Sequence, residues 1–329
     1  MTRATLDACE KRTAAVEFDA LVESTASVST CVKQLVLRRP DGADLPPWTP
    51  GAHIDLFLAN GTVRQYSLCG RPEDRQTWRI AVLREPDGSG RGGSEYVHRA
   101  LHSGSLVRVS APRNNFRLID AESYLFVAGG IGITPILPMV AAAESSGADW
   151  SLAYGGRSAA TMAFRDELAA YGDRVSVLPE DECGRLDLAG LLAGVDQATA
   201  VYCCGPAPLL EVIEQACADR AAGSLHVERF IPRAGADTHR DRPFEVVLAK
   251  QDRSFEVPPG ESILHTLESN GIDVPSSCRQ GMCGTCEQAL LEGEPDHRDE
   301  ILTPEERAAG EYILICVSRC RGDRLVLDL

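Results

Sequence analysis

The 329-residue sequence lacks an export signal, an excess of positive charge and any histidine cluster. Residues 1–23 contain no apolar run of the kind that a secretory signal needs, so we expect a cytoplasmic protein. The net charge of −15 repels nucleic acid and anionic membranes, which excludes both as expected partners. The seven histidines show no metal-ligand spacing, and we assign none of them a catalytic role.

A long uninterrupted apolar run is also missing, although one segment comes close. Residues 124–143 are about long enough to cross a bilayer, but they include three glycines and two prolines. That composition is typical of a strand, a turn and a buried helix. We therefore expect no membrane-spanning segment.

What the sequence does contain divides into three blocks behind a tail at 1–15. From 16 to 118, short strand-like runs are separated by turn-rich loops, which indicates a small antiparallel β-barrel or sandwich. From 119 to 231, strands and helices alternate, as in a parallel Rossmann-like α/β sheet. Residues 232–243 have no apolar period and are interpreted as a linker, and 244–329 form the third block. In the second block, helices are expected at 134–147, 163–172, 187–194 and 207–223.

Four of the twelve cysteines form a spaced set in the third block. They are Cys278, Cys283, Cys286 and Cys316. The pattern C-x4-C-x2-C, followed after 29 residues by the fourth cysteine, is that of plant-type [2Fe–2S] ligands. Glycines at 281 and 284 would let the backbone bend close to such a cluster. A zinc site would more commonly show paired C-x2-C knuckles, and a redox C-x2-C pair would leave two of the four cysteines unexplained.

Two glycine-containing turns come directly after predicted strands of the second block. The first is GGIGITP at 129–135, and the second is CGP at 204–206. Glycines let a pyrophosphate approach the backbone, and the next helix offers its N-terminal N–H groups. Since ligands of open parallel sheets bind at the carboxyl ends of strands, the two turns together predict a nucleotide site. A purely structural turn between strand and helix has the same appearance.

In the first block, Arg64, Tyr66 and Ser67 share one strand-like segment. An arginine neutralises a phosphate, an aromatic side chain stacks on a flat ring, and a hydroxyl bonds a ring heteroatom. An ordinary strand with a surface arginine is the alternative. The loop GRGGS at 90–94 offers backbone amides to a phosphate, or is simply a turn.

In this order, the R-x-Y-S segment, GGIGITP, CCGP and the cysteine set resemble the phthalate dioxygenase reductase family, from about residue 16 to the end. Its members are the reductase components of two-component Rieske oxygenases, and vanillate O-demethylase reductases are similar. The resemblance implies a flavin-binding antiparallel β-barrel, a Rossmann-like NAD(P)-binding domain and a C-terminal β-grasp ferredoxin domain. It further implies electron transfer from NAD(P)H through flavin and cluster to a Rieske-type aromatic oxygenase or demethylase.

The resemblance also assigns site residues. The flavin would be held by Arg64, Tyr66 and Ser67, with Arg91, Gly92, Gly93 and Ser94 around its phosphate. The pyridine nucleotide would be held by Gly129, Gly130, Gly132, Thr134, Pro135, Cys204, Gly205 and Pro206. Phe230 matches a position against the flavin ring. Relatives with a similar barrel bind FAD, but the loop 90–94 resembles the FMN branch, and we predict FMN.

The choice of nucleotide depends on the residues just after the second strand of the second block. Arg157 and Ser158 stand there, with no acidic neighbour in the sequence. An acid favours the free 2′-hydroxyl of NADH, whereas an arginine accommodates the 2′-phosphate of NADPH. We predict NADH from the resemblance, with NADPH as the alternative.

The third block carries 17 acidic and 8 basic side chains, so −9 of the net charge lies there. Such a surface suits docking on a basic patch of an oxygenase, although a merely solvated face has the same composition. We expect a monomer. Two other functions stay open: a reductase for another acceptor such as a cytochrome P450, and a non-catalytic electron carrier.

Overall fold

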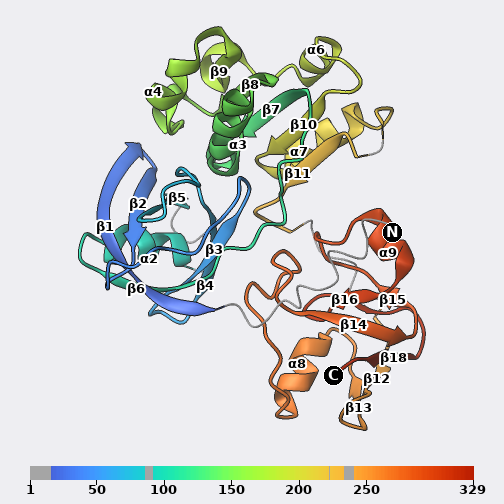
Figure 1. Ribbon diagram of the computed structural model, residues 1–329. Helices are drawn as coiled ribbons and strands as arrows, with labels where there is room; N and C mark the ends of the chain where they lie inside the picture. Colours follow the sequence, from blue (N-terminus) through green and yellow to red (C-terminus); the bar gives the residue numbers. More distant parts are fainter. Residues whose placement is uncertain (1–15, 86–91, 222, 233–240) are drawn as a thin grey trace. The chain divides into compact units, whose positions relative to one another are not determined.

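The computed structural model describes residues 16–85, 92–221, 223–232 and 241–329. These residues belong to two compact units. Glu17–Phe230 form the larger unit, drawn from blue to yellow in Figure 1, and Ile231–Leu329 belong to the smaller unit, drawn in orange and red.

The larger unit begins with a six-stranded antiparallel sheet in the order β4-β3-β6-β1-β2-β5. Its strands are β1 (Glu17–Ser29), β2 (Val32–Arg38), β3 (His53–Phe57), β4 (Val63–Ser67), β5 (Trp78–Leu83) and β6 (Leu106–Ser110), and its helix is α2 (Gly93–Ala100). Just beyond β4, the N–H of Cys69 donates to the carbonyl of Arg79 on β5 at 2.8 Å, so the two edges of the sheet meet. Alternating apolar side chains fill the interior. The predicted antiparallel barrel is confirmed.

The second sheet of the larger unit is parallel, in the order β11-β10-β7-β8-β9. Its strands are β7 (Ser123–Gly129), β8 (Asp149–Gly156), β9 (Val175–Pro179), β10 (Ala200–Cys204) and β11 (Leu225–Glu228). Phe126 packs with α3 (Ile133–Ser146) on one face, and Val127 packs with α6 (Leu188–Ala193) and α7 (Ala207–Ala216) on the other. The chain runs outward from β7 to β9 and then returns to β10, so the strand order reverses between β7 and β10. This is the predicted Rossmann-like layout.

The expected helix at 163–172 is broken into shorter pieces. Phe164 and Gly172 have positive φ values of 61° and 58°, which a continuous right-handed helix excludes. The pieces are α4 (Arg165–Leu168) and the 3-10 segment η3 (Ala169–Arg174), and the other short elements are η1 (Gly130–Gly132), η2 (Ala159–Thr161) and α5 (Glu180–Cys183). The helix expected at 207–223 ends early, at Ala216.

Side chains tie the two sheets of the larger unit together. Arg79 on β5 donates to both carboxylate oxygens of Glu167 on α4, at 2.9 and 3.0 Å. Its guanidinium also lies 5.1 Å from the ring centre of Phe164. The N–H of Thr30, at the β1–β2 turn, donates to the carbonyl of Ala160 at 3.1 Å. The barrel and the parallel sheet therefore hold a defined geometry relative to each other.

The smaller unit contains a mixed five-stranded sheet in the order β13-β12-β18-β14-β16, and a two-stranded sheet of β15 and β17. Its elements are β12 (Phe244–Leu248), β13 (Arg253–Val257), α8 (Ile263–Ser269), β14 (Glu287–Glu292), β15 (Pro295–Asp296), α9 (Pro304–Ala309), β16 (Tyr312–Leu314), β17 (Arg319–Cys320) and β18 (Arg324–Leu327). β12 and β18 pair in parallel, and α8 contributes Ile263, Leu264 and Leu267 to the core. A mixed sheet with one packed helix is the predicted β-grasp arrangement.

Among the described residues, no helix is long and apolar enough to span a membrane. The apolar segment at 124–143 is divided between strand β7 and helix α3. With 14 residues, α3 is about 21 Å long, shorter than the ~30 Å hydrocarbon core of a bilayer.

Candidate functional site

The four spaced cysteines meet in the smaller unit. Cys278, Cys283 and Cys286 lie between α8 and β14, and Cys316 comes just after β16. All four are buried. Their thiols hydrogen-bond as two pairs, Cys278 with Cys283 and Cys286 with Cys316. Within the described ranges, no three or more His, Cys, Asp or Glu side chains surround a point as the ligands of one metal ion do. Two pairs of thiols fit two irons better than one tetrahedral zinc ion.

Backbone N–H groups of the same loop point at the sulfur atoms. Gln280 and Met282 donate to Cys278 Sγ at 3.3 and 3.4 Å, and Gly281 donates to Cys316 Sγ at 3.3 Å. Such donors stabilise sulfur as the thiolate, which is the form that ligates metal. The hydrogen bond between paired thiols likewise lowers the pKa of Cys316. The donor set therefore fits a [2Fe–2S] cluster.

A side chain at Gly281 would disturb the cysteine loop, because the backbone conformation and the close neighbours leave no room for one. Its φ is +71°, and a Cβ would lie 2.6 Å from the Val317 side chain and 3.0 Å from Cα of Asp299. Gly284 also has a positive φ, of 75°. The glycines predicted to let the loop bend thus occupy left-handed positions.

On the barrel, β4 places Arg64 against the first turn of α2. A Cβ at Gly93 would come within 2.5 Å of Arg64 Nε, and Gly92, with φ +73°, precedes the helix. The Arg64 guanidinium therefore lies next to the first N–H groups of α2. A positive charge beside free N–H groups is an arrangement that suits a phosphate. Burial raises the pKa of the Tyr66 hydroxyl, so it stays protonated. Ser67 is buried and pairs with His53 on β3.

Ser94, predicted near the same phosphate, has a protein partner for its hydroxyl. The hydroxyl accepts from the N–H of Glu85 at 3.3 Å and donates to the Glu85 carboxylate at 3.4 Å. Arg91 lies outside the described residues. The structure thus brings Arg64 and Gly93 together, as predicted for a phosphate site. The Ser94 hydroxyl, in contrast, already hydrogen-bonds to Glu85.

The two glycine turns lie side by side at the carboxyl ends of β7 and β10. A Cβ at Gly132 would collide with the carbonyl of Cys204, and one at Gly129 would lie 2.7 Å from Cδ of Pro206. Gly130, with φ +56°, faces open space. At Gly129 and Gly132, a side chain is excluded because the two turns pack against each other. Their place is nevertheless the point where the strand order reverses, where open α/β sheets bind nucleotides.

The remaining residues of these turns have contacts within the protein. Gly205 lies against Gly129, where a Cβ would be 3.0 Å from Cα. Thr134 and Pro135 are buried in the first turn of α3, and the Thr134 hydroxyl donates to the carbonyl of Ile131 at 2.9 Å. Thr134 therefore holds the turn together.

Arg157 and Ser158 lie just beyond the end of β8. Arg157 is exposed, whereas Ser158 caps η2, with its hydroxyl 3.3 Å from that of Thr161. The N–H of Asp181 donates to the carbonyl of Arg157 at 3.3 Å, so the acidic start of α5, residues 180–182, lies beside Arg157. Sequence reasoning missed this contact because α5 comes after the next strand along the chain.

Glu228, at the end of β11, was also missed. It pairs across the sheet with Cys204, and its buried Oε2 has no hydrogen-bond partner among the described residues. Burial raises the pKa of this carboxyl to about 8 and raises that of the neighbouring Cys204 thiol. The only signal was an acidic residue inside the strand-like segment 224–230. Phe230, two residues further on, is 40% exposed.

Comparison with known proteins covers both units. Residues 246–321 match the family model described as 2Fe-2S iron-sulfur cluster binding domain. The chain is 43% identical to "phenoxybenzoate dioxygenase subunit beta" of Ectopseudomonas oleovorans, covering 89% of this chain and 91% of that one. It is 41% identical to the "carnitine monooxygenase reductase subunit" of Escherichia coli, covering 95% and 98%.

Two solved structures are similar over 95% of this chain. Phthalate dioxygenase reductase is 36% identical with a TM-score of 0.69, and the match covers 98% of its chain. An intact type IV self-sufficient cytochrome P450 monooxygenase is 42% identical with a TM-score of 0.89, and the match covers 41% of its chain.

Proposed function

Because the chain belongs to the phthalate dioxygenase reductase family, we propose that it supplies electrons to a Rieske-type oxygenase component. It is an NAD(P)H-dependent reductase that uses a flavin and a [2Fe–2S] cluster. Each NAD(P)H that is oxidised releases one proton and supplies the electrons for two one-electron reductions. The observation that carries the proposal is the buried cysteine quartet with its N–H donors, in one chain with the paired glycine turns.

We assign the flavin to Arg64, Tyr66 and Ser67, and its phosphate to residues 91–94. When bound, the flavin takes up a hydride and passes single electrons to the cluster, which is the chemistry that joins the two ends. Arg64 and the start of α2 would bind the phosphate. FMN is preferred to FAD, because the loop 90–94 resembles the FMN branch of the family. Chromatography of the flavin released by heat tests this; FAD in the supernatant would contradict it.

The pyridine nucleotide is assigned to the paired turns, with the adenosine ribose beside Arg157 and Ser158. The acidic start of α5 next to Arg157 favours the free 2′-hydroxyl of NADH. Steady-state kinetics with both nucleotides decide the matter. We expect kcat/KM to be higher for NADH. A higher value for NADPH would mean that Arg157, rather than the acidic start of α5, determines the choice of nucleotide.

The partner is tested by direct electron transfer. Purified protein, NADH and the oxygenase component of a related two-component system are mixed without oxygen, and reduction of the Rieske centre is followed by EPR. We expect that centre to be reduced in stoichiometric amounts.

A monomer and a cytoplasmic location are also part of the proposal. The location is inferred because the cysteines of the described ranges are free thiols, as is usual in a reducing compartment.

A second acceptor is favoured by one observation, the 42% identity to the self-sufficient cytochrome P450. The same mixture with a cytochrome P450 and carbon monoxide gives a direct readout of haem reduction. If the P450 is reduced and the Rieske centre is not, the second candidate replaces the first.

A further inference from the structure

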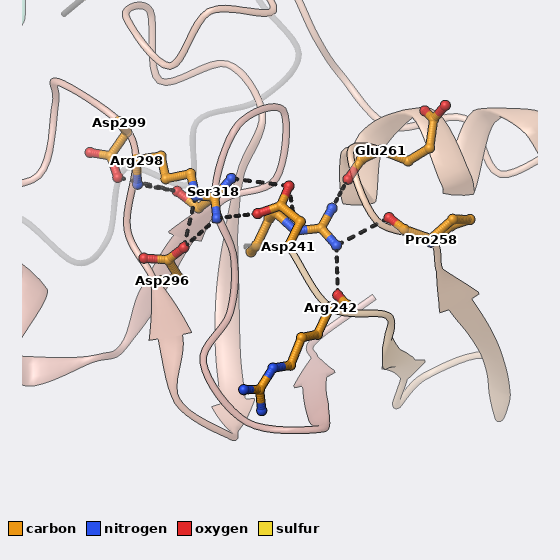
Figure 2. A network of polar contacts seen from close by, with 9 residues as sticks. Asp241, Arg242, Pro258, Glu261, Asp296, Arg298, Asp299 and Ser318 are labelled. Atoms are coloured by element: carbon orange, nitrogen blue, oxygen red, sulfur yellow. Dashed lines mark hydrogen bonds and ion pairs between the residues drawn. The ribbon is translucent and has the colours of Figure 1, made fainter. Parts of the chain in front are cut away.

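An ion-pair network in the smaller unit lies outside every cofactor contact assigned above (Figure 2). Arg298 donates to the two carboxylate oxygens of Asp241 at 2.6 and 3.4 Å. Arg319 Nε lies 3.4 Å from the same carboxylate, and Arg298 also pairs with Asp296 at 2.7 Å. The side chain of Asp241 is only 1% exposed. Its negative charge is therefore buried between two guanidinium groups.

Arg319 is held in place without Asp241. Its guanidinium donates to the carbonyls of Arg242 and Pro258, at 2.9 and 3.1 Å, and to that of Glu261. The side chain is 4% exposed. Because backbone carbonyls fix its position, neutralising Asp241 would leave a buried positive charge where it stands, with its counter-charge gone.

The network continues into the turn that carries Cys316. Arg319 lies three residues beyond Cys316 in the chain. Between them, the hydroxyl of Ser318 accepts from the N–H of Arg298 at 3.1 Å and donates to Asp299 at 3.4 Å. Figure 2 shows Ser318 next to Arg298 and Asp299 in this network. The two arginines are therefore attached to the turn of one cysteine.

The same network reaches the loop of the other three cysteines. The N–H of Glu300, next to Asp299, donates to the carbonyl of Gly281 at 2.9 Å. The N–H of Gly281 in turn donates to Cys316 Sγ at 3.3 Å. One connected set of contacts thus runs from Asp241, inside the predicted linker 232–243, to the sulfur atoms.

We propose that Asp241 is a positioning residue for the cluster, which anchors the end of the linker to the Cys316 turn and offsets the positive charge of Arg298 and Arg319. The proposal rests on the assignment of a [2Fe–2S] cluster to the four cysteines. A cluster gains one negative charge on reduction, so a nearby positive charge favours the reduced state and a negative one opposes it. Asp241 therefore lowers the reduction potential and keeps the cluster a strong donor to the next acceptor.

The test is a redox titration of the full-length holoprotein, followed by EPR of the reduced cluster. Asp241→Asn removes the buried negative charge while keeping the size of the side chain. We expect the equilibrium constant for one-electron reduction to rise about three- to tenfold, or ~28 to ~59 mV at about 59 mV per decade. Arg298→Gln removes a positive charge from the same network and should lower that constant by a similar factor.

Asp328→Asn is the matched control, because it also removes one acidic charge from this unit. Asp328 is 41% exposed and pairs with Lys250 on the surface, so solvent screens its charge. We expect the midpoint reduction potential of this variant to match that of the wild type. Asp241→Glu, which restores the charge, should return the midpoint toward the wild-type value.

Opposite shifts in Asp241→Asn and Arg298→Gln separate electrostatic control from loosening, since loosening of the turn would move both variants in the same direction. Shifts of the same sign, or none beyond the control, would overturn the proposal. If Asp241→Asn fails to hold a cluster, Arg298→Gln decides alone. A lowered midpoint potential in that variant supports the proposal, and a raised or unchanged one overturns it. A wild-type protein without iron and sulfide would instead contradict the proposed function.

Discussion

Glu228 is a half-buried residue beside Cys204, and one of its two carboxylate oxygens is fully buried. Its carboxyl has a pKa of about 8, against 4.5 in the unfolded chain, because burial disfavours the charged form. Between these two values the folded state holds one proton more than the unfolded state. The free energy of unfolding therefore falls as pH rises through this window, by at most about 1.4 kcal/mol per pH unit.

Glu228→Gln, which has no ionisable proton, should escape this loss. We expect its melting temperature, relative to wild type, to rise steadily from pH 5 to pH 8 and to level off above. Flavin fluorescence during heating reports the unfolding of the larger unit. Glu95→Gln, on the exposed face of α2 and paired with Arg99, should show no such trend. A pH-independent difference for Glu228→Gln would mean that the carboxyl titrates normally.

The cysteine loop offers a second residue-scale prediction at Gly281. Gly281→Ala forces a Cβ to within 2.6 Å of Val317 at a positive φ, which strains the backbone by about 1–2 kcal/mol. We expect the purified variant to hold less than half of the wild-type iron and sulfide. Gly322→Ala is the control, because its nearest neighbour would be Cys320 Sγ at 3.9 Å. Equal iron contents would show that the loop tolerates the side chain.

At the scale of elements, the sites of the larger unit depend on where strands end. β7 and β10 are neighbours in the sheet although 70 residues, 130–199, separate them in the chain. Their neighbourhood brings the turn at 129–132 against the turn at 204–206. The nucleotide site that we propose therefore depends on the pair of turns and not on either turn alone.

Gly132→Ala tests this packing, because its Cβ would collide with the carbonyl of Cys204. The turns must separate, so we expect KM for NADH to rise tenfold or more, equivalent to ~1.4 kcal/mol of binding, with flavin content unchanged. Gly194→Ala, at the end of α6, meets only ordinary contacts of 3.5 Å or more and should leave KM as it is. An unaltered KM in Gly132→Ala would separate the nucleotide site from these turns.

At the scale of the whole molecule, charge is distributed unevenly along the chain. The segment 244–329 carries 17 acidic and 8 basic side chains. Part of this charge is used internally, as in the contacts of Asp296 and Asp299 with arginines. Exposed acids remain on β14 and α9, including Glu292 and Glu305. We predict that they dock on a basic patch of the partner.

Electron transfer to a Rieske-type partner should therefore weaken with salt. We expect kcat/KM for the partner to fall severalfold between about 20 and 300 mM NaCl, because the Debye length shrinks over this range. Reduction of a neutral quinone by the same protein, followed by NADH absorbance, is the control and should stay constant. A partner rate that is insensitive to salt would indicate that the acidic face is only solvated.

The three types of fold and the iron–sulfur domain were predictable, because periodicity and ligand spacing are local properties of the chain. The broken helix at 163–172 was not, since Phe164 adopts a left-handed conformation with its ring packed in the core. The partner of Ser94 was likewise hidden, because Glu85 lies nine residues earlier in the chain. Contacts of this kind depend on distances between elements that a linear pattern does not contain.

By itself, the sequence determined which chemistry the chain can carry: thiolates at cluster spacing, glycines at strand ends, and an arginine and tyrosine on one strand. Only the tertiary structure decided that the thiols meet as two pairs, that α5 brings acids beside Arg157, and that one carboxylate oxygen of Glu228 is buried beside Cys204. The reason is physical. Ligand type depends on covalent composition, whereas pairing, burial and pKa depend on which distant segments the fold brings into contact.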